Sequence, residues 1–171
     1  MKKVVILLTI IAIGAVSAQA QKFAYVDSEY ILEKMPEYVT AQKQIDQIST
    51  QYQSTIEAEV KKVDQLFQTY QSQKGRLTDI QRQQREEEII NKEQAVKDLQ
   101  KSYFGQDGTV TKRTETLIKP IKDKVQRAID ALAKEGGYAV IFDVAAAPGF
   151  IYTNPTYDLS NRVLEKLGIR I

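Results

Sequence analysis

The feature that most constrains this chain is its uninterrupted run from Glu37 to Lys74, which contains no Gly and no Pro. Large residues recur along the run at steps of mostly three and four, which is the period of one face of an α-helix. At 1.5 Å per residue, such a helix would be roughly 60 Å long. The predicted stripe consists of Ile45, Ser49, Tyr52, Ile56, Val60, Val63, Phe67, Tyr70 and Leu77.

A second helix is expected directly after the first. Lys74-Gly75-Arg76 is the first flexible point, and Thr78 with Gln81 three residues later forms a capping-box pattern. Two helices joined by a turn of a few residues run antiparallel and bury their stripes on each other. The sequence therefore predicts a helical hairpin with its tip near residues 74–79, in which the numbers of facing residues sum to about 154. The stripe of the second helix contains Ile80, Ile89, Ile90, Val96, Leu99 and Tyr103.

This register predicts where the hairpin ends and where it is interrupted. Pro36 and Pro120 would lie at the same height, where the hairpin meets the rest of the chain. Gly105 and Gly108 would lie opposite Thr50, and each glycine weakens a helix by about 1 kcal/mol relative to alanine. We expect a kink, break or hinge at these two glycines, with a benign local distortion as the alternative.

Strand patterns lie on both sides of the hairpin. Residues 22–27 alternate, with Phe23 and Tyr25 on one face. Tyr138–Val144 is a near-continuous apolar run, typical of a strand that is buried on both faces. A further short strand is expected at Phe150–Thr153.

We therefore predict an α+β chain in which residues 21–35 and 119–171 form a small β-rich body and residues 36–118 form the hairpin. So small a core has to hold a hairpin much longer than itself, and oligomerisation is a common source of added support. We expect association between bodies, with the hairpins projecting in parallel. The residues expected at this contact are Phe23, Tyr25, Val140, Ile141 and Phe142.

The N-terminus has the pattern of a secretory signal. Two lysines precede the apolar residues Val4–Val16, and Ala18-Gln19-Ala20 provides a small-residue cleavage site. The apolar run is short for a membrane span of about 20 residues. The sequence predicts a signal peptide at residues 1–20, cleavage after Ala20 and a periplasmic mature chain, with an uncleaved anchor as the alternative.

Composition excludes several classes of function. The chain has no Cys and no His, which excludes thiol chemistry, Cys/His zinc sites and Ser-His-Asp triads. Removal of Lys2 and Lys3 lowers the basic residues from 24 to 22, equal to the 22 acidic residues, so the mature chain is neutral. Neutrality argues against nucleic-acid binding. Asp143 and Asp158 are interpreted as turn and cap residues, so we expect no enzyme, no metal and no cofactor.

Three segments in this order carry a family resemblance: AYVDSEYILEKMPEY followed by AQKQI, LIKPIKDKVQRAIDALAKEGGYAVIFD, and TYDLSNRVLEKLG. Over nearly all of residues 22–168 the chain resembles the Skp/OmpH family of periplasmic chaperones. The resemblance implies a jellyfish-like homotrimer, in which a β-rich hub carries three coiled-coil hairpins, or tentacles. The hairpins would enclose unfolded outer-membrane proteins without ATP, and the chain indeed has no Gly-rich phosphate loop. Typical members are basic, whereas this mature chain is neutral.

Two sets of hairpin residues are candidates for contact with partners. The aromatic candidates for contact with unfolded clients are Tyr38, Tyr70, Tyr103 and Phe104. The alternative is that such side chains fill the seam between the helices, as we expect for Tyr52 and Phe67. The basic candidates at the tip are Lys74, Arg76, Arg82 and Arg85, which could meet clients or make weak contact with a membrane surface. The alternative is a solvated helix end, because Glu86, Glu87 and Glu88 follow at once.

The sequence leaves one other function open. A structural or adaptor protein of the cell envelope would share the export signal and the coiled-coil hairpin, but it would bind one defined partner. Capture of many unfolded β-barrel proteins would distinguish the chaperone from this adaptor.

Overall fold

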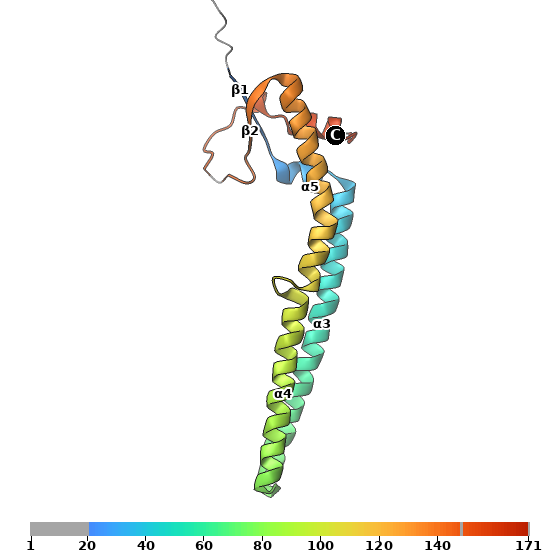
Figure 1. Cartoon of the computed structure of the whole chain (residues 1–171), viewed down its shortest axis with the longest axis vertical. Coiled ribbons are helices and arrows are strands. Elements are labelled where there is room, and N and C mark those ends of the chain that lie inside the picture. The colour runs from blue at the N-terminus through green and yellow to red at the C-terminus, as the bar shows by residue number, and fades with distance from the viewer. Residues whose placement is uncertain (1–20, 148, 171) are drawn as a thin grey trace, which may run out of the picture. The chain divides into compact units, whose positions relative to one another are not determined.

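The structure, a computed structural model, describes residues 21–147 and 149–170, so the predicted signal peptide lies outside the described residues. The described chain is mostly helical and has a small two-stranded sheet (Figure 1). Its elements are β1 (Lys22–Val26), α2 (Ser28–Glu33), α3 (Pro36–Gln73), η1 (Lys74–Arg76), α4 (Asp79–Phe104), α5 (Thr109–Gly136), β2 (Tyr138–Asp143), η2 (Pro155–Tyr157) and α6 (Ser160–Lys166).

The chain divides into two compact units. Within the described residues, one unit consists of Tyr30–Gln126, and the other consists of the residues up to Glu29 and from Arg127 onward. None of the helices in the described residues combines the length and the hydropathy that crossing a membrane requires.

The predicted helical hairpin is confirmed. α3 begins with Pro36 at its first position, where the missing N–H costs nothing, and α4 begins after Thr78. The Thr78 hydroxyl accepts from the Gln81 N–H at 3.3 Å, and the Gln81 side chain accepts from the Thr78 N–H at 3.0 Å. This capping box satisfies two backbone donors at the start of α4. α3 and α4 lie side by side in Figure 1.

The facing residues match the predicted register closely. Tyr52 and Tyr103 stack with ring centroids 4.0 Å apart and planes 6° from parallel, and their numbers sum to 155. The Tyr70 hydroxyl donates to the Glu86 carboxylate, and these two residue numbers sum to 156. Pro36 and Pro120 line the same cleft between α3 and α5. The register therefore holds along the length of the hairpin.

The predicted stripe of α3 is wrong at two positions. Val60 and Phe67 are exposed, whereas Glu59 and Leu66 are half-buried and line the cleft between α3 and α4. When two seam residues are seven positions apart, the seam residue between them can be either the third or the fourth residue after the first one. The position of α4 beside α3 selects Glu59 and Leu66.

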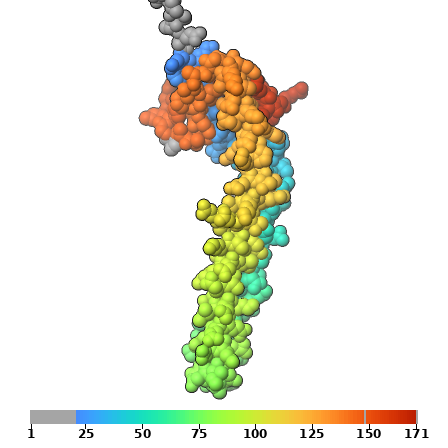
Figure 2. Space-filling model, in the orientation of Figure 1, coloured from blue at the N-terminus to red at the C-terminus, as the bar shows by residue number. Residues whose placement is uncertain are grey.

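The predicted interruption at the two glycines is confirmed as a break, because α4 ends at Phe104 and α5 begins at Thr109. The connection projects from the side of the helix pair in Figures 1 and 2. Its backbone is packed tightly, since the Gly108 N–H donates to the Gly105 carbonyl at 2.9 Å. A Cβ on Gly108 would lie 2.6 Å from the Tyr103 carbonyl oxygen. Glycine is therefore required here by close backbone approach.

The other unit contains the sheet. β1 and β2 pair in parallel, with Phe23 opposite Val140 and Tyr25 opposite Phe142. Residues paired across a ladder point to the same face, so these four side chains share one face of the sheet. The opposite face buries Ala24 and Val26 of β1. Val163 and Leu164 of α6 are also buried, as is Leu159, the residue that directly precedes this helix.

Two predictions about the sheet are wrong. Residues Phe150–Thr153 form no strand. In the described residues, one edge of β1 pairs with β2 and the other carries an isolated bridge from Tyr25 to Asp158. β2 is also not buried on both faces, since Val140 and Phe142 are exposed. A two-stranded sheet leaves one face open in a single copy of the chain.

Candidate interaction surfaces

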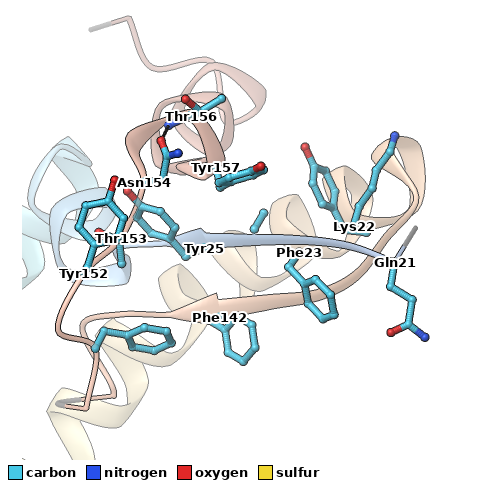
Figure 3. Close-up of a pocket in the computed structure, with 13 residues that line it drawn as sticks. Gln21, Lys22, Phe23, Tyr25, Phe142, Tyr152, Thr153, Asn154, Thr156 and Tyr157 are labelled. Carbon is cyan, nitrogen blue, oxygen red and sulfur yellow. Dashed lines mark hydrogen bonds between the residues drawn. The ribbon is translucent and has the colours of Figure 1, made fainter. Parts of the chain in front are cut away.

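The open face of the sheet forms an aromatic hollow in the unit that contains β1 and β2. A cavity of 720 Å³ is lined by side chains of both strands and of the segment after Gly149 (Figure 3). Phe142 and Phe150 meet edge to face, with ring centroids 5.6 Å apart and planes at 65°. The exposed aromatic residues of this surface are Phe23, Phe142, Phe150, Tyr152 and Tyr157.

The residues predicted at the body-to-body contact lie on two different faces of the sheet. Phe23, Tyr25 and Phe142 line the hollow, and Phe23 and Phe142 project side by side from the two strands in Figure 3. Val140 shares their face by its pairing with Phe23. Ile141 pairs with Ala24 and so belongs to the other face.

Sequence reasoning missed three residues of this surface. Phe150, Tyr152 and Tyr157 line the hollow together with the strands. The signal for them was an aromatic-rich stretch directly after the Gly149 turn, which we interpreted as a strand. The strand interpretation placed Phe150 and Tyr152 in a sheet, whereas the structure leaves them exposed beside it. Tyr157 lies beyond the predicted strand, in η2.

The four aromatic candidates on the hairpin lie in different environments. Tyr70 is buried at 4 % exposure, and Tyr103 stacks on Tyr52 in the seam. Tyr38 is half-buried and Phe104 is exposed. The seam interpretation is confirmed for Tyr52 and wrong for Phe67, which is 44 % exposed.

Tyr70 forms a cross-helix contact near the tip. The hydrogen bond from its hydroxyl to the Glu86 carboxylate raises the pKa of Tyr70, and burial adds to this effect. A raised pKa means that the folded chain holds the proton to a higher pH than the unfolded chain. The stabilisation of the folded chain by this hydrogen bond is therefore complete below about pH 10, and it is lost as the pH rises through the raised pKa of Tyr70.

We expect Tyr70 to titrate above the ordinary range of tyrosine, and Glu86→Gln to bring its pKa down because the carboxylate charge is removed. Ultraviolet difference titration of the wild-type, Tyr70→Phe and Glu86→Gln chains measures this, since Tyr70→Phe identifies the contribution of this one residue among nine tyrosines. An identical alkaline titration in the wild-type and Glu86→Gln chains would contradict the assignment.

The basic residues at the tip are partly engaged by neighbours. Arg82 pairs with Asp79 at 2.5 Å and Arg85 pairs with Glu88 at 2.7 Å. The Lys74 ammonium lies 5.5 Å from the centre of the Tyr70 ring. Exposed pairs of this kind contribute about 0–1 kcal/mol to the free energy of unfolding. Their main effect is to neutralise part of the positive charge at the tip.

Asp143 has the predicted turn role, and Asp158 binds the first residue of α6, although the N-cap position itself is Leu159. Asp143 accepts from the Ser28 N–H at 3.1 Å and from the Ala145 N–H at 3.2 Å. Asp158 accepts from the Ser160 N–H at 2.8 Å and from its hydroxyl at 2.6 Å. Within residues 21–147 and 149–170, no group of three or more acidic side chains is placed to hold a metal ion.

The family model described as Outer membrane protein (OmpH-like) matches residues 22–167. This match takes in both strands, the whole hairpin and α6. The chain belongs to the OmpH-like family.

A solved structure has the same fold as this OmpH-like chain. A candidate outer membrane chaperone (OmpH-like) from Caulobacter crescentus matches it with a TM-score of 0.65 and 14% sequence identity. The match covers 91% of this chain and 88% of the Caulobacter chain. No curated protein matches the chain in sequence. Family and fold together support a chaperone role in general terms.

Proposed function

We propose that this OmpH-like protein is a periplasmic, ATP-independent holdase that binds unfolded outer-membrane proteins and prevents their aggregation. The observation that carries the proposal is the uncovered aromatic face of the β1–β2 sheet, combined with membership of the OmpH-like family. In this proposal, copies of the chain assemble through the aromatic face, and the assembly brings several hairpins around one client.

The assembly proposed is a homotrimer built through the aromatic face. Contiguous exposed apolar patches on a soluble domain mark interaction sites. The hollow is lined by Phe23, Phe142 and Phe150 of one chain, and a contact between unlike patches of successive copies closes into a ring when the rotation allows. The body would then consist of residues 21–35 and 119–171 of each copy.

The client would be held by contacts that are weak and non-directional, as the hydrophobic effect is. Such binding suits unfolded chains of different sequence, and it needs no covalent step and no nucleotide. The connection at Gly105 and Gly108 is proposed as a hinge that lets hairpins spread around clients of different size. The tip residues Lys74 and Arg76 are proposed to make weak contact with clients or with a membrane surface.

Dilution of a urea-unfolded outer-membrane β-barrel protein into the purified mature chain tests this function. We expect static light scattering to report a trimer, and turbidity to show that the barrel stays soluble without added ATP. A monomer that leaves barrel aggregation unchanged would overturn the proposal. Binding of one folded envelope protein at fixed stoichiometry, with no effect on aggregation, would indicate the adaptor instead.

A further inference from the structure

One flank of the hairpin carries nearly all of its exposed large apolar side chains. Within the described residues of α3 and α4, these side chains are Val39, Val60, Phe67, Ile80, Ile90 and Phe104. Except for Ile80, each directly follows a seam residue that is buried or half-buried. The corresponding seam residues are Tyr38, Glu59, Leu66, Ile89 and Tyr103.

In both helices, the residue that directly follows a seam residue points to one particular side of the helix pair. With 3.6 residues per turn, one step along the chain rotates the side chain by about 100° around the helix axis. Because α3 and α4 are antiparallel and face each other, this rotation brings side chains of both helices to the same flank of the pair. Val60 and Phe67 of α3 therefore share a flank with Ile90 and Phe104 of α4.

The contacts of Phe104 confirm this geometry. Phe104 lines a cleft with residues of α3, which are Ser49, Thr50, Gln53, Ser54 and Glu57. Three of these, Thr50, Gln53 and Glu57, directly follow a seam residue, which is buried or half-buried. Residues that follow the seam on α4 thus meet residues that follow the seam on α3.

The register places three of these side chains close together. With facing numbers that sum to 155 or 156, Ile90 lies level with residues 65 and 66. It is thus about 3 Å along the axis from Phe67, and Val60 is about 10 Å from Phe67 on the same helix. Ile90 is 61 % exposed and Phe67 is 44 % exposed. Val60, Phe67, Ile90 and Phe104 are here named the apolar flank.

Within the described residues of the hairpin, the opposite flank has no exposed large apolar side chain. Beside the apolar flank, the positions that precede the seam are occupied by Ala58, Lys62, Gln65 and Thr69 on α3 and by Glu88, Ala95, Asp98 and Ser102 on α4. Ile48, which precedes Ser49 nearer the start of α3, is half-buried. The hairpin is therefore two-sided, with one flank polar and the other interrupted by large apolar side chains.

The pattern of the apolar flank fits an unfolded chain better than a second hairpin. A packed helix requires apolar residues at steps of three and four along its whole length, whereas Asp64 lies between Val60 and Phe67. A few partly exposed side chains offer on the order of 300 Å². A stable interface buries roughly 800 Å² per partner.

We infer that the apolar flank is the surface on which this chain holds apolar segments of an unfolded polypeptide, with Phe67 and Ile90 as its main contacts. The inference rests on the proposed holdase function and assigns it to one side of the hairpin. It moves the contact away from Tyr70 and Tyr103, whose rings belong to the seam.

Two matched isoleucines of α4 provide the test. Ile90 lies on the apolar flank, and Ile80, 71 % exposed, does not follow a seam residue. We expect Ile90→Ser to raise the Kd for a fluorescently labelled, urea-unfolded β-barrel protein about threefold, and the double variant Phe67→Ser with Ile90→Ser to raise it about tenfold. Ile80→Ser is expected to change the Kd by less than about twofold. Equal effects of Ile80→Ser and Ile90→Ser would overturn the inference.

Photocrosslinking provides a second measurement of where the unfolded barrel protein contacts the hairpin, and it does not require the apolar side chains of the flank to be removed. A photoreactive phenylalanine analogue in place of Phe67 is expected to crosslink to the barrel, whereas the same analogue in place of Thr69, on the polar flank, is not. Equal crosslinking from both positions would overturn the assignment to one flank. If the wild-type chain does not bind the barrel, the holdase function itself fails; if it binds and the double variant binds equally well, only the apolar flank fails.

Discussion

Phe142→Asp is expected to convert the proposed homotrimer into single chains. Phe142 is 41 % exposed on the open face of the sheet, beside Phe23 and in edge-to-face contact with Phe150. In an assembly that covers this face, the aspartate would place an unpaired carboxylate in an apolar contact. The cost of burying such a charge is several kcal/mol, or more than a thousandfold in the association constant. Assembly at micromolar concentrations would not survive this loss.

Light scattering and sedimentation equilibrium measure the mass of the wild-type and Phe142→Asp chains. Phe142→Leu is the matched control, because it keeps an apolar side chain at the same position and is expected to keep the assembled mass. Far-ultraviolet circular dichroism checks that the aspartate variant retains its helices. A Phe142→Asp chain with the wild-type mass would show that copies do not meet through this face.

Leu164→Ala is expected to lower the free energy of unfolding by about 3 kcal/mol. Leu164 is fully buried, with 0 % exposure, and it shares the small core of its unit with Val26, Leu159 and Val163. Removing a buried leucine side chain loses its transfer free energy and leaves a cavity that a tight core fills only partly. Because this core contains few large residues, the loss is a substantial part of the 5–15 kcal/mol that stabilises a typical domain, about a fifth or more.

Urea unfolding followed by circular dichroism, at equal protein concentrations, measures this loss. Glu165→Ala on the same helix is the control, because Glu165 is exposed and surface substitutions usually change stability by less than about 0.5 kcal/mol. Equal unfolding midpoints for Leu164→Ala and Glu165→Ala would show that α6 contributes little to the folded core.

The helices of the hairpin could be predicted from local sequence. α3 starts at Pro36, and the Thr78–Gln81 capping box starts α4. The two glycines between Phe104 and Thr109 end one helix and allow the next to begin. Each of these signals acts within three or four residues, so no knowledge of the partner helix was needed.

The candidate surfaces could be predicted only in part. Phe23, Tyr25 and Phe142 were expected together and line one hollow. Ile141 was expected with them, but a one-residue step along a strand turns a side chain to the other face. Phe67 was expected in the seam, although a neighbouring residue, Leu66, lies there instead.

The sequence by itself determined the type, length and ends of the long elements and the register of the hairpin, because periodicity, caps and glycines act through the chain's own neighbouring residues. Only the tertiary structure decided which side chains stay open to solvent. Whether Leu66 or Phe67 enters the seam depends on the side from which α4 approaches α3, and the exposure of Phe142 depends on the sheet having two strands. Both are contacts between segments far apart in the chain, which no local pattern specifies.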